Sequence, residues 1–209
     1  MGEHEVDEIN RDGLGLRQRK KLERRHAIEA AALDLFERHG FEETTIGDIA
    51  AVVGISPRTF FYYFETKEDV VLADYARRQT RIIGELTGRP DDETPWTSLK
   101  ASFLAVASDY ETEREQLLRR GIIMATNPSV FARSLQLQAG WEDSLAHALT
   151  ERMSTSEDVS TTPRLLAASA LVAMRSSLRH WLKTGATDPL PRLVGECFDK
   201  LSSGLGAAR

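Results

Sequence analysis

The stretch from Thr44 to Lys67, TTIGDIAAVVGISPRTFFYYFETK, decides how the rest of the chain is interpreted. Thr44 or Thr45 can cap a helix, and Asp48 follows Thr45 by three residues, as in a capping box. Gly54 then supplies the backbone freedom that a sharp turn requires. The first half of the stretch therefore predicts a short helix that ends in a tight turn.

The second half of the stretch predicts another short helix. Ser56 can cap it, and Pro57 fits its first turn, where a missing N–H costs nothing. The helix should run from Pro57 to about Phe64, before Thr66 caps the next helix. Two short helices joined by a glycine turn form the helix-turn-helix pattern, whose second helix enters the major groove of DNA.

Five consecutive aromatic residues, Phe60 to Phe64, make this second helix unusual. Phe60 and Phe64 are one turn apart and can fill the core together, which leaves Tyr62 and Tyr63 on other faces. Their hydroxyl groups can then reach phosphate oxygens. A buried aromatic core helix is the alternative, but a segment this short is an unusual core helix.

These residues resemble the signature of TetR-type transcriptional regulators, T-T-x-x-x-I-A-x-x-x-G-[IV]-S-x-x-T-x-Y-x-Y-F-x-x-K-[ED]-x-[LV]. In that register the chain carries Thr44, Thr45, Ile49, Ala50, Gly54, Ser56, Thr59, Tyr63, Phe64, Lys67 and Glu68. It departs at Phe61, where the family often has a tyrosine, so one phosphate-binding hydroxyl is missing. The Ser-Pro-Arg-Thr-Phe-Phe-x-Tyr-Phe variant resembles a branch that includes the mycofactocin-type regulators. The resemblance covers Arg17 to Tyr75, and the remainder matches only in helical layout.

The segment before the helix-turn-helix is strongly basic, with six cationic residues between Arg17 and Arg25 and one acid, Glu23. Most charge runs are solvated helix faces, but this position favours contact with DNA phosphates. We expect Arg58 to reach a base edge, and Tyr63 and Lys67 to bind phosphate. The candidate DNA-binding residues are Arg17, Arg19, Lys20, Lys21, Thr44, Thr45, Ser56, Pro57, Arg58, Thr59, Phe61, Tyr62, Tyr63 and Lys67.

The whole chain has an ordinary globular composition, with 209 residues and a net charge of −5, so any DNA-binding surface must be local. Its one cysteine, Cys197, excludes an internal disulfide framework and a multi-cysteine zinc site, and fits a reducing cytoplasm. No apolar run approaches the roughly 18 residues of a membrane span. The N-terminus also lacks the apolar core of a signal peptide.

The remaining pattern predicts an all-α protein of about nine helices. The first helix should end near His39, and a fourth should run from Lys67 to about Thr87. After the Gly- and Pro-rich break at 87–95, five further helices are expected over about 96–114, 116–126, 128–153, 163–184 and 189–205. We expect a disordered tail at 1–15, a helix-turn-helix domain at 16–66, and a ligand-binding and dimerisation domain at 67–209.

The last two expected helices carry apolar stripes at helical spacing. Two such helices can pair with a second copy in a four-helix bundle, or they can simply form the core of one chain. The resemblance implies dimerisation through the last helices. The candidate interface residues are Leu171, Leu178, Trp181, Val194, Phe198 and Leu201.

A ligand site is harder to identify, because each large apolar residue of the middle helices can equally be plain core. Arg120 and Arg175 lie in apolar-to-small runs, and a buried arginine needs a partner, either an internal acid or an anionic ligand. The candidates are Phe103, Arg120, Met124, Phe131, Trp141, Leu145, Met174 and Arg175. The resemblance to mycofactocin-type regulators suggests a long-chain acyl-CoA.

Motifs for enzymatic chemistry are missing from the sequence. It has no Gly-rich phosphate loop after a strand, no G-x-S-x-G, and no histidine pair at metal-ligand spacing. The interpretation is a DNA-binding repressor without a cofactor, which binds a palindromic operator as a homodimer and is released by a hydrophobic effector. The alternatives are an efflux regulator with a neutral or cationic inducer, and a helical protein-interaction adaptor.

Overall fold

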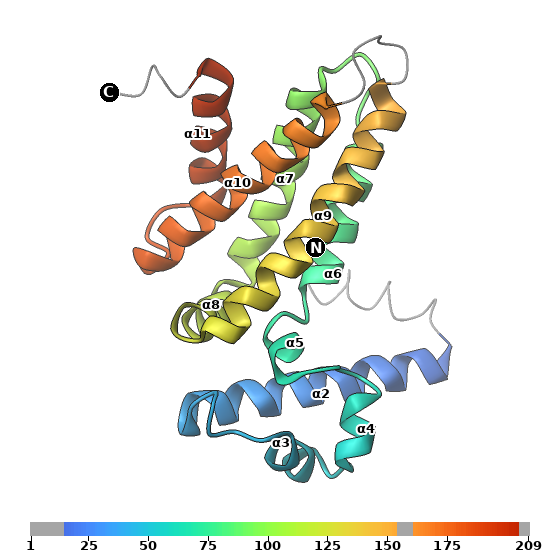
Figure 1. Cartoon of the computed structure of the whole chain (residues 1–209), viewed down its shortest axis with the longest axis vertical. Helices are drawn as coiled ribbons and strands as arrows, with labels where there is room; N and C mark the ends of the chain where they lie inside the picture. The colour runs from blue at the N-terminus through green and yellow to red at the C-terminus, as the bar shows by residue number, and fades with distance from the viewer. Residues whose placement is uncertain (1–14, 154–160, 205–209) are drawn as a thin grey trace. The chain divides into compact units, whose positions relative to one another are not determined.

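The computed structural model describes residues 15–153 and 161–204, and it shows ten helices and no strand in these two ranges (Figure 1). The chain divides into two compact units, residues 1–73 and 74–209. We call the described parts the head (15–73) and the body (74–153 and 161–204). The tail expected at 1–15 lies outside the described residues except for Gly15. An all-α architecture is confirmed.

The head consists of helices α2 (Leu16–His39), α3 (Ile46–Val53), α4 (Pro57–Phe61) and α5 (Lys67–Val71). Helix α2 packs on α3 and α5, and α3 packs on α4. The core of the head is formed by the buried residues Ile28, Ala32, Leu33, Phe36, Phe41, Ile49, Ala50, Phe60, Phe64, Val70, Val71 and Leu72. These contacts hold the two short helices of the helix-turn-helix on the long helix α2.

The capping signals of the helix-turn-helix are confirmed. The Thr45 hydroxyl accepts a hydrogen bond from the Asp48 N–H, and the Asp48 carboxylate accepts one from the Thr45 N–H, which completes the capping box. Both the side chain and the backbone of Thr45 lower the pKa of Asp48. Gly54 adopts the left-handed conformation with φ 69°, and Ser56 caps α4 by accepting from the Thr59 N–H. The turn between α3 and α4 is therefore encoded locally.

Two helices differ from the sequence-based expectation. Helix α4 ends at Phe61, and the residues up to Phe64 continue as hydrogen-bonded turns, with the Phe64 N–H 3.1 Å from the Phe60 carbonyl oxygen. The single helix expected from Lys67 to Thr87 is divided, because Val70, Val71 and Leu72 are all buried and one helix face cannot bury three consecutive residues. The head thus extends to Ala73, beyond the expected boundary at Thr66.

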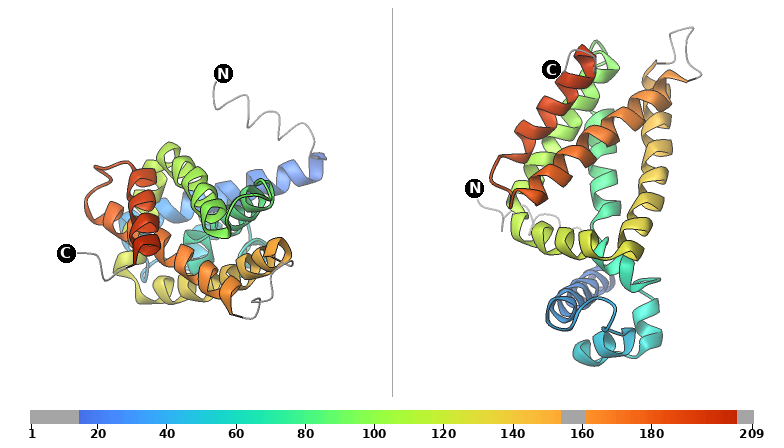
Figure 2. Two further views of the ribbon diagram at one scale, coloured as in Figure 1. Left: turned by 90° about the horizontal axis from the view of Figure 1, so that it is seen from above. Right: turned by 60° about the vertical axis from the view of Figure 1, so that its left-hand side comes forward.

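The body contains α6 (Tyr75–Thr87), α7 (Pro95–Thr112), α8 (Arg114–Thr126), α9 (Pro128–Met153), α10 (Thr162–Lys183) and α11 (Leu190–Ser203). Helix α10 lies against both α9 and α11, and α7 packs on α6 and α11 (Figure 2). The side chains at their centre are fully buried and include Leu99, Phe103, Leu145, Leu149, Trp181 and Phe198. None of the described helices is both long and apolar enough to cross a bilayer.

The stripes on the last two helices prove to be core residues of a single chain. Trp181, Val194 and Phe198 are each 0% exposed, so the sequence-based assignment of these three to a dimer surface is wrong. Phe198, for example, stacks between Trp96 and Phe103, with ring centroids 4.8 and 5.7 Å away. The three other candidates, Leu171, Leu178 and Leu201, pack in or against the same core. Amphipathic stripes show which face is buried but not which partner buries it.

Candidate DNA-binding surface and ligand cavity

The exposed face of the head combines the second helix of the helix-turn-helix with the basic start of α2. On α4 and the following turn, Arg58, Phe61 and Tyr62 are exposed, the last two by 55% and 63%. The Lys21 ammonium lies over the Tyr62 ring, 5.0 Å from its centroid. This cation–π contact brings the basic segment and α4 together on one surface.

Most of the predicted cations on α2 are available to bind an anion. Arg17, Lys20, Lys21 and Arg24 are exposed, and Arg19 is half-buried. Arg25, by contrast, is used within the head, because its guanidinium contacts the Tyr63 carbonyl at 3.3 Å and stacks over the Phe64 ring. The basic segment thus supplies exposed positive charge, and its Arg25 side chain holds the turn that follows α4.

Four predicted DNA contacts use their polar groups inside the head. Thr44 is buried, and its hydroxyl donates to the Gly40 carbonyl at 2.7 Å. The Thr45 and Ser56 hydroxyls cap α3 and α4, as described above. The Lys67 ammonium donates to the carbonyl oxygens of Phe41, Glu42 and Thr44 at 2.7, 3.3 and 3.4 Å.

The arrangement around Lys67 changes the role expected for that residue. Its ammonium also lies 4.3 Å from the centroid of the Phe41 ring. An ammonium has only three N–H donors, and three carbonyl groups already occupy them. We therefore infer that Lys67 holds the loop between α2 and α3. This geometry does not favour the phosphate contact that the sequence predicted for Lys67.

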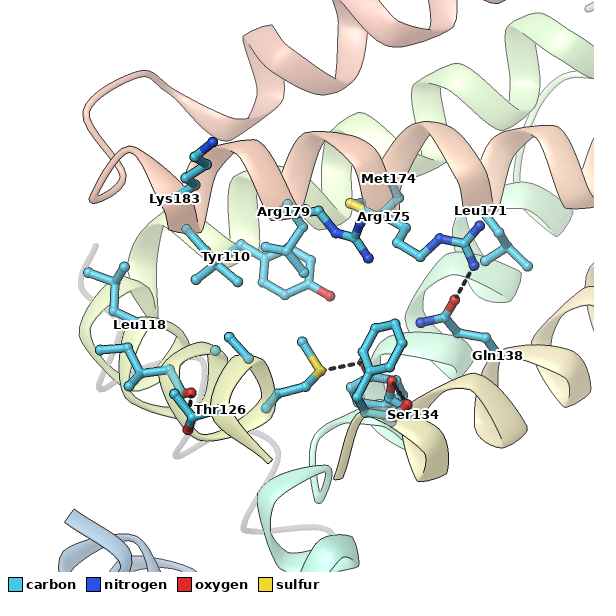
Figure 3. Close-up of a pocket in the computed structure, with 18 of the residues that line it drawn as sticks. Tyr110, Leu118, Thr126, Ser134, Gln138, Leu171, Met174, Arg175, Arg179 and Lys183 are labelled. Carbon is cyan, nitrogen blue, oxygen red and sulfur yellow. Dashed lines mark hydrogen bonds between the residues drawn. The ribbon is translucent and has the colours of Figure 1, made fainter. Parts of the chain in front are cut away.

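The body contains a cavity of about 990 Å³ that is lined mainly by residues of α8, α9 and α10 (Figure 3). Its wall is mainly apolar and aromatic, and includes Tyr75, Tyr110 and Trp141. The Tyr75 and Trp141 rings are in contact, with centroids 5.3 Å apart. A cavity of this size and lining is typical of a site for a small organic molecule.

Five of the eight ligand candidates from the sequence meet in this wall: Met124, Phe131, Trp141, Met174 and Arg175. The other three do not line it. Phe103 and Leu145 are buried in the core, and Arg120 lies with its guanidinium 4.0 Å from the Asp74 carboxylate. For Arg120, therefore, the structure supports the internal acid rather than the ligand as a partner.

A row of cations borders the cavity on α10. Arg175, Arg179 and Lys183 follow one another at intervals of four residues on α10, and all three line the cavity. In Figure 3, Arg175 and Arg179 reach toward the other lining residues, whereas the Lys183 ammonium points away from them. Arg175 donates to the Gln138 side-chain oxygen at 3.1 Å, and the Arg179 guanidinium lies 6.0 Å from the centroid of the Phe131 ring. The same three residues line a second cavity of about 480 Å³ with Ser176 and His180.

Arg179 and Lys183 were not among the candidates predicted from the sequence, although their four-residue spacing from Arg175 could have identified them. Within the described part of the chain, no carboxylate lies within ion-pair distance of either residue. Like charges one turn apart destabilise a helix slightly. An apolar cavity with such a cationic edge can accept an amphipathic molecule that carries an anionic end.

A buried ionic network beside the cavity was also missed. Arg78 is only 3% exposed, donates to Asp74 at 2.5 Å and to Glu113 at 2.7 Å, and stacks on the Tyr110 ring at 3.7 Å. Burial lowers the pKa of Arg78, but Tyr110, Asp74 and Glu113 together raise it above its usual value, so the guanidinium stays charged. Burial raises the pKa of Tyr110, which keeps its hydroxyl protonated.

Comparison with protein families gives two matches. Residues 28–73 match "Bacterial regulatory proteins, tetR family", and residues 93–206 match "MftR C-terminal domain". The chain is 28% identical over 180 residues to a protein assigned as a mycofactocin biosynthesis transcriptional regulator, MftR, of Mycobacterium tuberculosis; the match covers 86% of the chain and 90% of that protein. It is 30% identical over 183 residues to the HTH-type transcriptional regulator TcmR of Streptomyces glaucescens, covering 85% and 81%.

A similar arrangement of helices occurs in solved structures. FadR of Thermus thermophilus, a repressor crystallised with lauroyl-CoA, matches with a TM-score of 0.55 and 21% identity, over 87% of this chain and 94% of that one. At this identity the likeness concerns the fold alone.

Proposed function

The chain belongs to the tetR family of bacterial regulatory proteins, and we propose that it is a transcriptional repressor that a small amphipathic molecule releases from DNA. The observation that carries the proposal is the pairing of two sites in one chain. The head exposes Arg58 and Phe61 on α4 together with several cations on α2, and the body contains a cavity of about 990 Å³. A protein-interaction adaptor requires neither feature.

The proposed complex is a homodimer on a palindromic operator in the cytoplasm. Two recognition helices would enter successive major grooves, about 34–36 Å apart, and the cations of α2 would bind phosphate. The test is a gel shift with DNA that flanks the gene, at two salt concentrations. If an excess of unrelated DNA displaced the protein from this DNA, the binding would be non-specific and would contradict the proposal.

Arg58→Ala is expected to weaken operator binding by roughly 1–3 kcal/mol per half-site and to relax the preference at one base position, because Arg58 is exposed on α4. Lys20→Ala is the matched control, since Lys20 is an exposed cation of α2. Lys20→Ala should weaken binding to all DNA sequences equally and should reduce the salt dependence of binding. Competition binding with a panel of single-base variants measures both effects, and unchanged specificity in Arg58→Ala would reject the assignment.

A surface for the homodimer is proposed on the outer face of α10. Leu165 and Val172 are large apolar residues with 68% and 42% of their surfaces exposed, and two helical turns separate them on one face. Val172→Glu should therefore shift the protein toward monomer without unfolding it, because a charge would enter the seam between two copies. Sedimentation velocity and circular dichroism measure the two effects. A parent protein that is monomeric at micromolar concentration would contradict the dimer.

The effector that fits the cavity best is an elongated apolar molecule with an anionic end, and we propose a long-chain acyl-CoA. The apolar wall would bury the acyl chain, and Arg175, Arg179 and Lys183 would bind the head group by charge-assisted hydrogen bonds. The second candidate is an efflux-type regulator with a hydrophobic inducer, which the aromatic wall of Tyr75, Tyr110 and Trp141 favours. The three cations argue against a cationic inducer.

Release from DNA requires that the effector bind one conformation of the protein better than the other. A differential affinity of about 1–3 kcal/mol would change operator affinity about 5–150-fold. Helix α6 is the proposed moving element, because Tyr75 lines the cavity and lies in the first turn of the body after Ala73.

A further inference from the structure

The exposed aromatic ring of Phe61 is the least expected feature of the head surface. More than half of its surface, 55%, is exposed, although Arg58 lies one helical turn before it and the Lys21 ammonium lies over the ring of the next residue, Tyr62. The adjacent Phe60 is completely buried and meets Phe61 edge to face, with centroids 5.8 Å apart. The ring is therefore held at its base and projects from a cationic surface.

An exposed phenylalanine at this position cannot bind a phosphate as a tyrosine can. It has no donor group, and covering a phosphate oxygen with an apolar ring would remove water without replacing its hydrogen bonds. In the major groove the one apolar group that distinguishes a base is the 5-methyl group of thymine. Contact with that methyl would bury two apolar surfaces together.

We propose that Phe61 is a specificity-determining residue that recognises the 5-methyl group of a thymine in each operator half-site. This inference rests on the proposed function, because it requires operator binding through α4. It also predicts part of the operator sequence. Side chains three residues apart on a helix, such as Arg58 and Phe61, have Cβ atoms about 5–6 Å apart.

That separation restricts where the thymine can lie. Bases in one strand are stacked about 3.4 Å apart, so the two side chains span one to two base steps. The thymine should therefore lie within two positions of the base that Arg58 contacts, which is expected to be guanine. Phe61 would thus recognise a thymine through its methyl group, next to the base that Arg58 recognises through hydrogen bonds.

The test uses a duplex selected by the full-length protein from a random-sequence library. Each thymine is replaced in turn by deoxyuridine, which lacks only the methyl group. At the position that Phe61 contacts, replacement in a single half-site should weaken binding about fourfold, and the symmetric replacement in both half-sites about fifteenfold, as expected for burial of one methyl group at each site. Phe61→Ala should bind the thymine duplex more weakly and should lose the difference between thymine and deoxyuridine.

Two matched variants separate this role from a general effect on the surface. Phe61→Leu retains an apolar side chain and should keep part of the discrimination, whereas Tyr62→Ala, which alters the neighbouring exposed ring, should keep all of it. Circular dichroism confirms folding. A deoxyuridine penalty that persists in Phe61→Ala would overturn the proposal while leaving operator binding intact. Failure to select any sequence would overturn the proposed function as well.

Discussion

Arg78→Met is expected to lower the free energy of unfolding of the body by about 3–5 kcal/mol. The Arg78 side chain is 4% exposed, and its guanidinium binds Asp74 and Glu113, whose side chains are 12% and 28% exposed. Without it, both carboxylates would keep their charge in a poorly solvated position. The Tyr110 ring would also lose the cation that stacks on it at 3.7 Å. Urea unfolding followed by tryptophan fluorescence measures the loss as a lower midpoint with an unchanged slope.

A neighbouring arginine provides the control for this experiment. Arg77 donates to the same carboxylate, Glu113, at 2.7 Å, but its side chain is 63% exposed. Arg77→Met should therefore cost less than about 1 kcal/mol. Asp74→Asn added to Arg78→Met should recover only part of the loss, because it removes one buried carboxylate but also the acid that lies 4.0 Å from the Arg120 guanidinium. Equal effects of the two arginine substitutions would show that burial does not make Arg78 special.

The helix-turn-helix was predictable because its signals act over short distances. Thr45 and Asp48 are three residues apart, Gly54 needs only its own backbone freedom, and Ser56 caps a helix that begins at the next residue. Each interaction closes within one helical turn, so the local sequence determines it. The division of the long helix after Val71 was not predictable in this way, since no glycine or proline marks it.

The cavity and its ionic network depend on contacts that a single sequence does not specify. Arg78 and Glu113 are 35 residues apart, and Arg78 stands in the segment YARRQTR, where nothing distinguishes it from its neighbours. Phe103 and Met174 likewise have similar apolar character, yet Phe103 is core and Met174 lines the cavity. Only the way in which the helices from α6 through α10 pack together decides which apolar side chains contact one another and which line the cavity.

The affinity of the body for acyl-CoAs is expected to rise by about 0.8 kcal/mol, or roughly fourfold, for each CH₂ group added to the chain. Eight further CH₂ groups would then contribute about 6 kcal/mol. The rise should stop when the chain fills the cavity of about 990 Å³. Titration of operator release with acyl-CoAs from butyryl to stearoyl measures this dependence, and fluorescence of Trp141, which lines the cavity, reports binding directly.

The head group and the chain should contribute separately, and substitutions at the two ends can resolve them. Arg175→Gln combined with Arg179→Gln should weaken all acyl-CoAs by a common factor and leave the increment per CH₂ unchanged, because both side chains border the cavity on α10. Met124→Trp should instead leave short chains unaffected and end the rise at a shorter chain, since it adds bulk to the wall. Free CoA and a neutral hydrophobic drug are the controls. Release by the drug alone would favour the efflux-type regulator, and release only by short polar metabolites would reject both effectors while the repressor remained.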